Sequence, residues 1–220
     1  MNLGIESLGA AILKGVCSSE AKDLAVDWSE FGLDILLDDG LLKDAPMIGS
    51  VVKFCTISKT IRDRIFLGKV CDFMRACPRF SDSEKEKFVR EQLSDQTKAN
   101  RLGHTLVLIL DKLDDLCKPL MLARFFTGFV RGEIGWEDFR RLASAIDIGF
   151  VDDLTEFASL SNPSVERMRV LYPNLVRTGL VGLKGPRTPG QGGISQISYQ
   201  VTELGKLFQK SMNEPKSPQL

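Results

Sequence analysis

The chain has 220 residues, of which 43% are hydrophobic and 26% are charged, and its formal net charge is zero. This composition is typical of a folded globular protein and excludes a wholly disordered chain. A neutral chain also lacks an overall basic field that would draw it onto nucleic acid.

Apolar side chains recur at helical spacing in the N-terminal third of the chain, at residues 3–16 and again at 28–36. Pro46 suits the first turn of a further helix, because its missing N–H is not needed there. The apolar pattern then continues to residue 74 and stops before Pro78. These residues therefore predict a series of amphipathic helices.

The middle of the chain continues the helical pattern. Ser81 and Glu84 have the spacing of a capping box, which predicts the start of a helix. An apolar stripe covers residues 102–116, and Pro119 suits the start of the next helix. The sequence GEIG at 132–135 predicts a glycine-bounded turn, after which apolar spacing indicates another helix at 136–146.

The character of the chain changes after residue 162. Residues 164–181 predict a helix that is bent near Pro173, and residues 182–193, rich in Gly and Pro, predict a loop. Residues 194–201 alternate apolar and polar side chains, which indicates a strand, and Thr202 suits the N-cap of a final helix.

These patterns predict a mainly α protein, with a multi-helix bundle followed by a small α+β module. We expect a helical domain at residues 1–148, the α+β module at 150–212 and a disordered tail at 213–220. The chain is long enough for each domain to have its own core.

The C-terminal module resembles the end of a bacterial winged-helix domain over about 50 residues. The residues that carry the resemblance are Thr178, Gly179, Leu180, Val181, Tyr199, Val201, Thr202, Gly205 and Leu207. It implies a strand at the Thr-Gly-Leu-Val segment, a glycine-rich wing and a second strand, with residues 151–160 forming the preceding helix. This fold is compatible with several functions.

If this winged-helix-like module contacts nucleic acid or a partner, the resemblance indicates which basic residues take part. Those on or near the recognition helix are Arg167, Arg169 and Arg177, and those in the wing are Lys184 and Arg187. Such side chains can neutralise phosphates, and arginine can bind guanine through two hydrogen bonds. Binding of DNA, binding of a protein and a purely structural role all remain open.

A second basic segment follows the mainly apolar residues 46–57. Residues 46–79 hold seven basic and two acidic side chains, whereas residues 1–45 hold three basic and nine acidic ones. The cations expected on a membrane-binding or partner-binding face are Lys53, Lys59, Arg62, Arg64 and Lys69. The favoured interpretation is a core helix pair whose cations face the acidic N-terminal block. An anionic membrane surface and a partner-binding face are the alternatives.

Catalytic motifs are missing from the sequence. It contains no GxxxxGK[ST], GxGxxG or GxSxG motif, and His104, on the apolar stripe, is its only histidine. Five cysteines without a CxxC pair favour reduced thiols and argue against a zinc site. We therefore expect no enzyme activity, no catalytic residue, no cofactor and no metal, and a core or boundary position for His104.

Several segments also resemble an uncharacterised group of bacterial helical proteins from accessory gene clusters, including phage-defence clusters. The residues concerned are Ile61–Phe66, Lys69, Phe73, Leu110–Leu113 and Gly132–Phe139. The resemblance implies a sensor or adaptor in antiviral defence that acts through protein–protein contacts. A DNA-binding transcriptional regulator and a membrane-surface effector using residues 46–75 are the alternatives. No leader or membrane-spanning run is evident, so the expected location is the cytoplasm, with a peripheral membrane position as the alternative.

Overall fold

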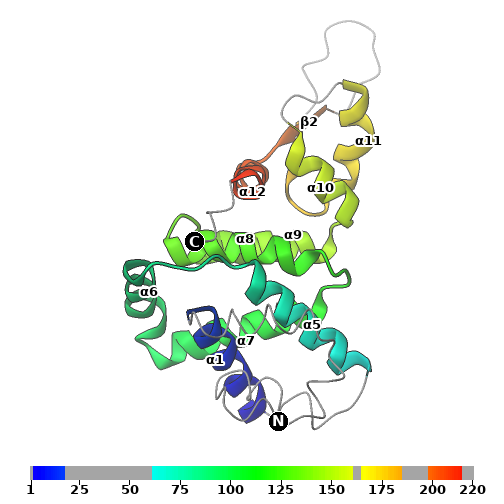
Figure 1. The fold of residues 1–220 in the computed structure, drawn as a ribbon. Coiled ribbons are helices and arrows are strands. Elements are labelled where there is room, and N and C mark those ends of the chain that lie inside the picture. The colour runs from blue at the N-terminus through cyan, green and yellow to red at the C-terminus, as the bar shows by residue number, and fades with distance from the viewer. Residues whose placement is uncertain (1, 18–60, 161–164, 185–197, 215–220) are drawn as a thin grey trace, which may run out of the picture. The chain divides into compact units, whose positions relative to one another are not determined.

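The computed structural model describes residues 2–17, 61–160, 165–184 and 198–214 (Figure 1). Within these residues the chain is mainly helical, with a small antiparallel sheet of two strands near the C-terminus. The predicted helical class is therefore confirmed, together with its small strand component. The chain divides into two compact units, of which the first ends at Ile134 and the second begins at Gly135.

The described helices of the first unit pack in pairs. They are α1 (Asn2–Cys17), α5 (Ile61–Ala76), α6 (Asp82–Phe88), the π-helical turn η2 (Val89–Leu93), α7 (Gln96–Lys112) and α8 (Lys118–Arg131). Helix α1 crosses α7, and α5 packs against α8 (Figure 1). At the first crossing a Cβ on Gly103 would lie only 2.8 Å from the carbonyl carbon of Gly9. The two backbones can approach this closely because neither residue has a side chain.

An aromatic cluster forms the core of the first unit. Phe73 of α5 lies edge-on to Phe126 of α8, with ring centroids 5.4 Å apart. Phe88 of α6 lies edge-on to Phe126 at 6.0 Å and to Phe129 at 5.9 Å. Edge-to-face contacts are favourable because the positive edge of one ring meets the negative face of the other. The cluster thus joins three helices.

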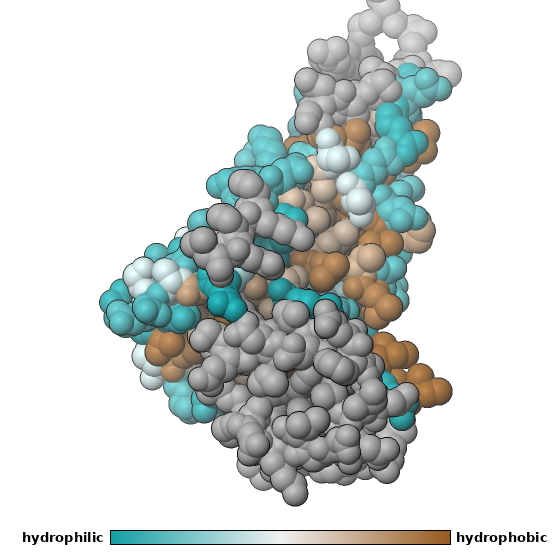
Figure 2. All heavy atoms as spheres, viewed as in Figure 1, coloured by the Kyte–Doolittle hydropathy of each residue, from teal (hydrophilic) through white to brown (hydrophobic). Residues whose placement is uncertain are grey.

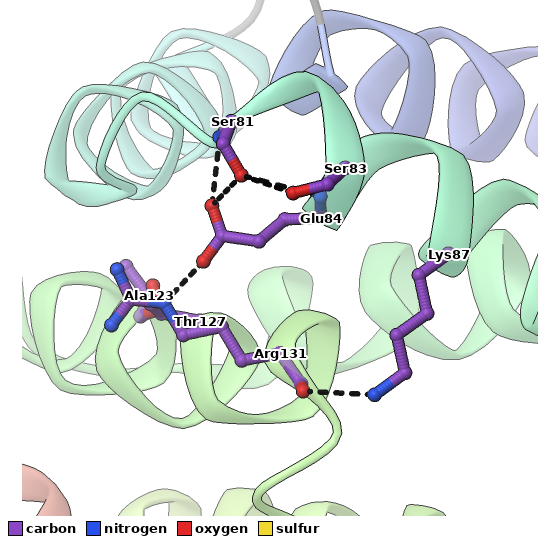
Figure 3. A network of polar contacts seen from close by, with 7 residues as sticks. All are labelled: Ser81, Ser83, Glu84, Lys87, Ala123, Thr127 and Arg131. Carbon is purple, nitrogen blue, oxygen red and sulfur yellow. Dashed lines mark hydrogen bonds and ion pairs between the residues drawn. The ribbon is translucent and has the colours of Figure 1, made fainter.

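The Glu84 carboxylate links the start of α6 to the end of α8 through hydrogen bonds (Figure 3). Its carboxylate accepts hydrogen bonds from the backbone N–H of Ser81 at 2.7 Å and from its Oγ at 2.9 Å. The Ser81 hydroxyl in turn accepts from the Glu84 N–H, which confirms the predicted capping box. The other carboxylate oxygen of Glu84 accepts from Arg131 Nε at 2.9 Å.

The second unit contains helices around the small sheet. Its elements are α9 (Trp136–Ile148), α10 (Val151–Ser159), α11 (Val165–Val176), β1 (Val181–Lys184), β2 (Ser198–Val201) and α12 (Glu203–Asn213). Our expected boundary, between residues 148 and 150, assigns α9 to the first domain. The structure instead groups α9 with the second unit, where it contacts α12.

The core of the second unit joins α10, α11 and α12. The ring of Phe157 lies 5.8 Å from Phe208 and 6.2 Å from Tyr172. Two amide side chains of α12 also reach the end of α10: Gln209 donates to the carbonyl of Phe157 at 2.8 Å, and Asn213 donates to that of Ala158 at 2.7 Å. These bonds supply donors to the last carbonyls of α10, of which that of Phe157 also accepts from the Leu160 N–H at 3.3 Å.

The two strands of the sheet are β1 and β2, which pair in antiparallel register. Val181 pairs with Val201, and Leu183 pairs with Tyr199. The strand that the winged-helix resemblance implied at residues 178–181 begins only at Val181, because Gly179 has a left-handed backbone, with φ of 77°, in the turn after α11. Residues 182–184, expected in the loop, instead belong to β1. The rest of the expected loop and the first half of the expected second strand lie at 185–197, outside the described residues.

Candidate recognition surface

The basic residues predicted for the C-terminal module lie on consecutive elements that pack together, α11 and β1. Arg167 and Arg169 are exposed on α11, Arg177 is exposed directly after it, and Lys184 is exposed at the end of β1. Arg187 lies outside the described residues. The structure thus places three of the five candidates on this pair of elements and a fourth in the turn between them.

Acidic residues of α10 engage the polar face of α11. Arg167 donates hydrogen bonds from Nε and Nη2 to the two carboxylate oxygens of Glu156. These bonds hold the pKa of Glu156 below its ordinary value and raise the pKa of Arg167. Asn174 donates to the Asp153 carboxylate at 3.1 Å. Part of the basic character expected for α11 is therefore neutralised from within the unit.

Apolar side chains are also exposed on these elements. Val170 of α11 and Leu183 of β1 each expose 58% of their surface. Leu183 is paired with Tyr199, and Tyr199 contacts the buried Tyr172 of α11, so Leu183 lies on the sheet face that α11 covers. Figure 2 shows hydrophobic residues beside hydrophilic ones over α10 and α11. The surface is mixed in character and is not uniformly basic.

The second predicted set of cations lies around α5. Lys53 and Lys59 are outside the described residues, whereas Arg62 and Arg64 are exposed on α5. Arg62 Nη2 donates to both carboxylate oxygens of Asp111, at 3.2 and 2.9 Å. Asp111 belongs to α7, so the partner of this cation is the end of a helix that lies outside the acidic block 1–45.

Lys69 differs from its expected place on an outer face. It is only 6% exposed, and its ammonium group donates to the carbonyls of Leu110 at 3.1 Å, Asp111 at 3.0 Å and Leu113 at 2.6 Å. Burial lowers its pKa, although the nearby Asp111 carboxylate opposes that effect. The physical reason for its position is that the last carbonyls of α7 need donors, which Lys69 supplies.

The structure also bears on the candidates for metal and catalytic chemistry. His104 is exposed on α7, so its expected core or boundary position is wrong. Within the described ranges, His, Cys, Asp and Glu side chains form no group of three or more that could hold a metal ion. None of the helices described is both long and apolar enough to span a membrane.

The acidic partners of the predicted basic residues were not predicted from the sequence. Glu156 and Asp153 compensate α11, and Asp111 binds Arg62. The sequence signal for Glu156 and Asp153 was the acidic character of α10. The pattern of one helix does not indicate which neighbouring element its carboxylates contact. No family model, curated protein or solved structure matches the chain.

Proposed function

We propose that this chain is a non-enzymatic recognition protein that binds a protein partner through α11 and β1. We define the α11–β1 surface by Arg167, Arg169, Val170, Leu183 and Lys184. The partner surface that fits it has an apolar centre bordered by acidic side chains, because exposed valine and leucine here accompany cations.

The observation that carries this proposal is the pairing of Arg167 with Glu156 on a helix that, together with the strand it packs against, also exposes two apolar side chains. A surface that binds the DNA backbone gains its affinity from cations that are free to neutralise phosphates. Here one of those cations already has a carboxylate partner. Exposed apolar side chains, by contrast, gain free energy when another protein covers them.

We further propose that the second unit is winged-helix-like, with α11 in the place of the recognition helix and residues 185–197 as the wing. The support is the order of the elements: three helices, α9 to α11, precede the two antiparallel strands β1 and β2. Winged-helix modules serve both DNA and protein recognition, so this architecture does not choose between them.

A DNA-binding regulator is the second candidate, and a specific observation favours it. The side chains of Arg177 and Lys184 have no hydrogen bond or ion pair within the described part of the chain, so both can contact phosphate. Such binding weakens steeply as salt rises. A membrane-surface effector is a third candidate for residues 46–75, although the burial of Lys69 removes one of its expected cations.

Bacterial antiviral defence is our proposed setting, with the cytoplasm as the location. It depends on the resemblance of Ile61–Phe66 and Gly132–Phe139 to proteins of phage-defence clusters. In this setting the partner is a phage-derived component or an effector protein that receives the signal.

The decisive test is the affinity for a purified partner. Proteins captured from infected and uninfected bacterial cells are identified and purified, and their binding to the full chain is measured. Val170→Glu and Leu183→Glu should each weaken binding at least about tenfold, because each places a carboxylate in the apolar centre. Leu108→Glu is the matched control, since Leu108 is 48% exposed on α7 in the first unit.

Other results would assign another function. Equal binding by all three variants would contradict the proposal. Tight binding to duplex DNA at low salt, lost in Arg167, Arg169 and Arg177 substitutions, would favour the regulator. Sedimentation of the chain with anionic vesicles would favour the membrane effector.

A further inference from the structure

The second unit contains a pocket of about 490 Å³ that the preceding assignments do not use. It lies between α9, the turn after α11 and the start of α12. Its lining residues are Arg141, Ser144, Arg177, Thr178, Gly179, Thr202, Glu203 and Leu204. A pocket of this size can hold a small molecule.

Two arginines contribute positive charge to the pocket. The guanidinium groups of Arg141 and Arg177 have no hydrogen bond or ion pair with any described residue. The one carboxylate in the lining, Glu203, is already paired with Lys206 at 2.7 Å. The neighbouring Arg140 differs from these two because its guanidinium has a partner: it lies over the ring of Trp136, 5.9 Å from the ring centroid.

The turn that carries Arg177 is held by hydrogen bonds. Thr202 Oγ1 donates to the Gly179 carbonyl at 2.7 Å and accepts from the Gly205 N–H at 3.0 Å. Thr178 Oγ1 donates to the Leu175 carbonyl at 2.6 Å, and it accepts from the Leu180 N–H at 3.2 Å. This part of the pocket lining is therefore held in place without a ligand, which reduces the conformational entropy lost on binding.

We propose that this pocket binds the phosphoryl group of a small phosphorylated molecule. Each guanidinium can donate two parallel hydrogen bonds to phosphate oxygens, and two guanidiniums match the two negative charges of a phosphomonoester. The Ser144 hydroxyl, which has no partner among the described residues, supplies a further donor, and Leu204 supplies an apolar contact. A carboxylate has one charge and two oxygens, so it uses fewer of these donors.

This proposal does not rest on the α11–β1 surface, and the two are tested separately. Phenyl phosphate, inorganic phosphate and benzoate are titrated into the full chain at constant ionic strength, and backbone amide NMR shifts are followed. Phenyl phosphate should give saturable shifts at Gly179 and Thr202. Inorganic phosphate should bind at the same place, and the difference between the two affinities tells whether the organic group adds to binding.

Substitutions then identify the groups that bind. Arg141→Gln and Arg177→Gln should each weaken phenyl phosphate binding about tenfold or more, because each removes one charged, two-pronged donor. Arg140→Gln is the matched control and should leave the affinity unchanged. The exchanged side chains are exposed, so the amide spectrum of the rest of the second unit should be preserved.

Three results would overturn the proposal. The first is that the amide shifts caused by phenyl phosphate do not saturate, or that they persist in both Arg141→Gln and Arg177→Gln. A second is benzoate binding as tightly as phenyl phosphate, which would assign the pocket to carboxylates. A third is loss of duplex binding in these variants without any phenyl phosphate binding, which would assign the two arginines to nucleic acid.

Discussion

Glu84 connects α6 and α8 through a single carboxylate. Burial alone would raise its pKa, but the hydrogen bonds from Ser81 and Arg131 outweigh burial and hold the pKa below its ordinary value of 4.5. A carboxyl group whose pKa is lowered in the folded state stabilises the fold above its unfolded pKa. This stabilisation is lost as the pH falls through the lowered, folded-state pKa.

Glu84→Gln should therefore destabilise the protein by about 1 kcal/mol near neutral pH, because it removes a charge-assisted bond to Arg131. The difference from the parent chain should shrink as the pH falls below about 4.5 and through the folded-state pKa. Urea unfolding followed by circular dichroism at several pH values measures it. Glu86→Gln, at an exposed position of α6, is the control. A difference that does not change with pH would contradict the explanation.

Lys69 gives a second prediction at the same scale. Lys69→Met keeps the apolar stem and leaves the carbonyls of Leu110, Asp111 and Leu113 without their shared donor. Leaving buried acceptors unpaired should cost about 1–3 kcal/mol in the free energy of unfolding. Lys112→Met, at an exposed lysine near the same helix end, should cost far less. Equal losses in chemical denaturation would mean that general charge, not capping, is responsible.

Single residues also mark the limit of prediction from sequence. Arg62 and Lys69 are seven apart, so their common direction could be predicted, and both reach the end of α7. The groups that accept their hydrogen bonds could not be predicted, because backbone carbonyls have no signature in the sequence. Leu116 was placed in the apolar stripe, but it is 63% exposed because α7 ends at Lys112 and the chain turns.

At the scale of whole elements, helix existence was predictable and exact limits were not. The capping box at Ser81 and the glycine turn at Gly132, with φ of 78°, lie where the sequence indicated them. The π-helical turn η2 has no distinct periodicity in five residues, so no pattern predicted it. The α11–β1 surface was predictable in its basic residues only, since exposure of Val170 depends on which face α11 packs.

The crossing of α1 and α7 allows a sharp test at this scale. Gly103→Ala places a methyl group 2.8 Å from the backbone of Gly9, where α1 must move away. Overpacking of this kind costs about 1–3 kcal/mol, more than the helix propensity that alanine gains. Gly68→Ala, on α5 with no atom within 4 Å of the added group, should instead stabilise the protein by about 0.5–1 kcal/mol. Thermal unfolding of both variants measures the contrast, and stabilisation by Gly103→Ala would refute the tight crossing.

The sequence pattern predicted two parts in the molecule, but the boundary expected between them lies one helix later than the boundary in the structure. A change in composition after residue 162 indicated a second module, and the structure has a second compact unit that begins at Gly135. Its start at Gly135 was not visible, because α9 has the same amphipathic pattern as the helices before it. Its contact with α12, a segment distant in sequence, places it with the second unit.

Two units with separate aromatic cores predict separate responses to core damage. Phe126→Ala and Phe157→Ala each remove a fully buried ring, and such changes cost about 3–5 kcal/mol. Phe126 contacts rings of α5, α6 and α8, whereas Phe157 contacts rings of α11 and α12. Amide hydrogen exchange should therefore accelerate mainly before Ile134 in the first variant and mainly after Gly135 in the second. Leu108→Ala, at an exposed apolar position, is the control and should change neither. Equal acceleration along the whole chain in both core variants would mean that the molecule opens as one cooperative unit.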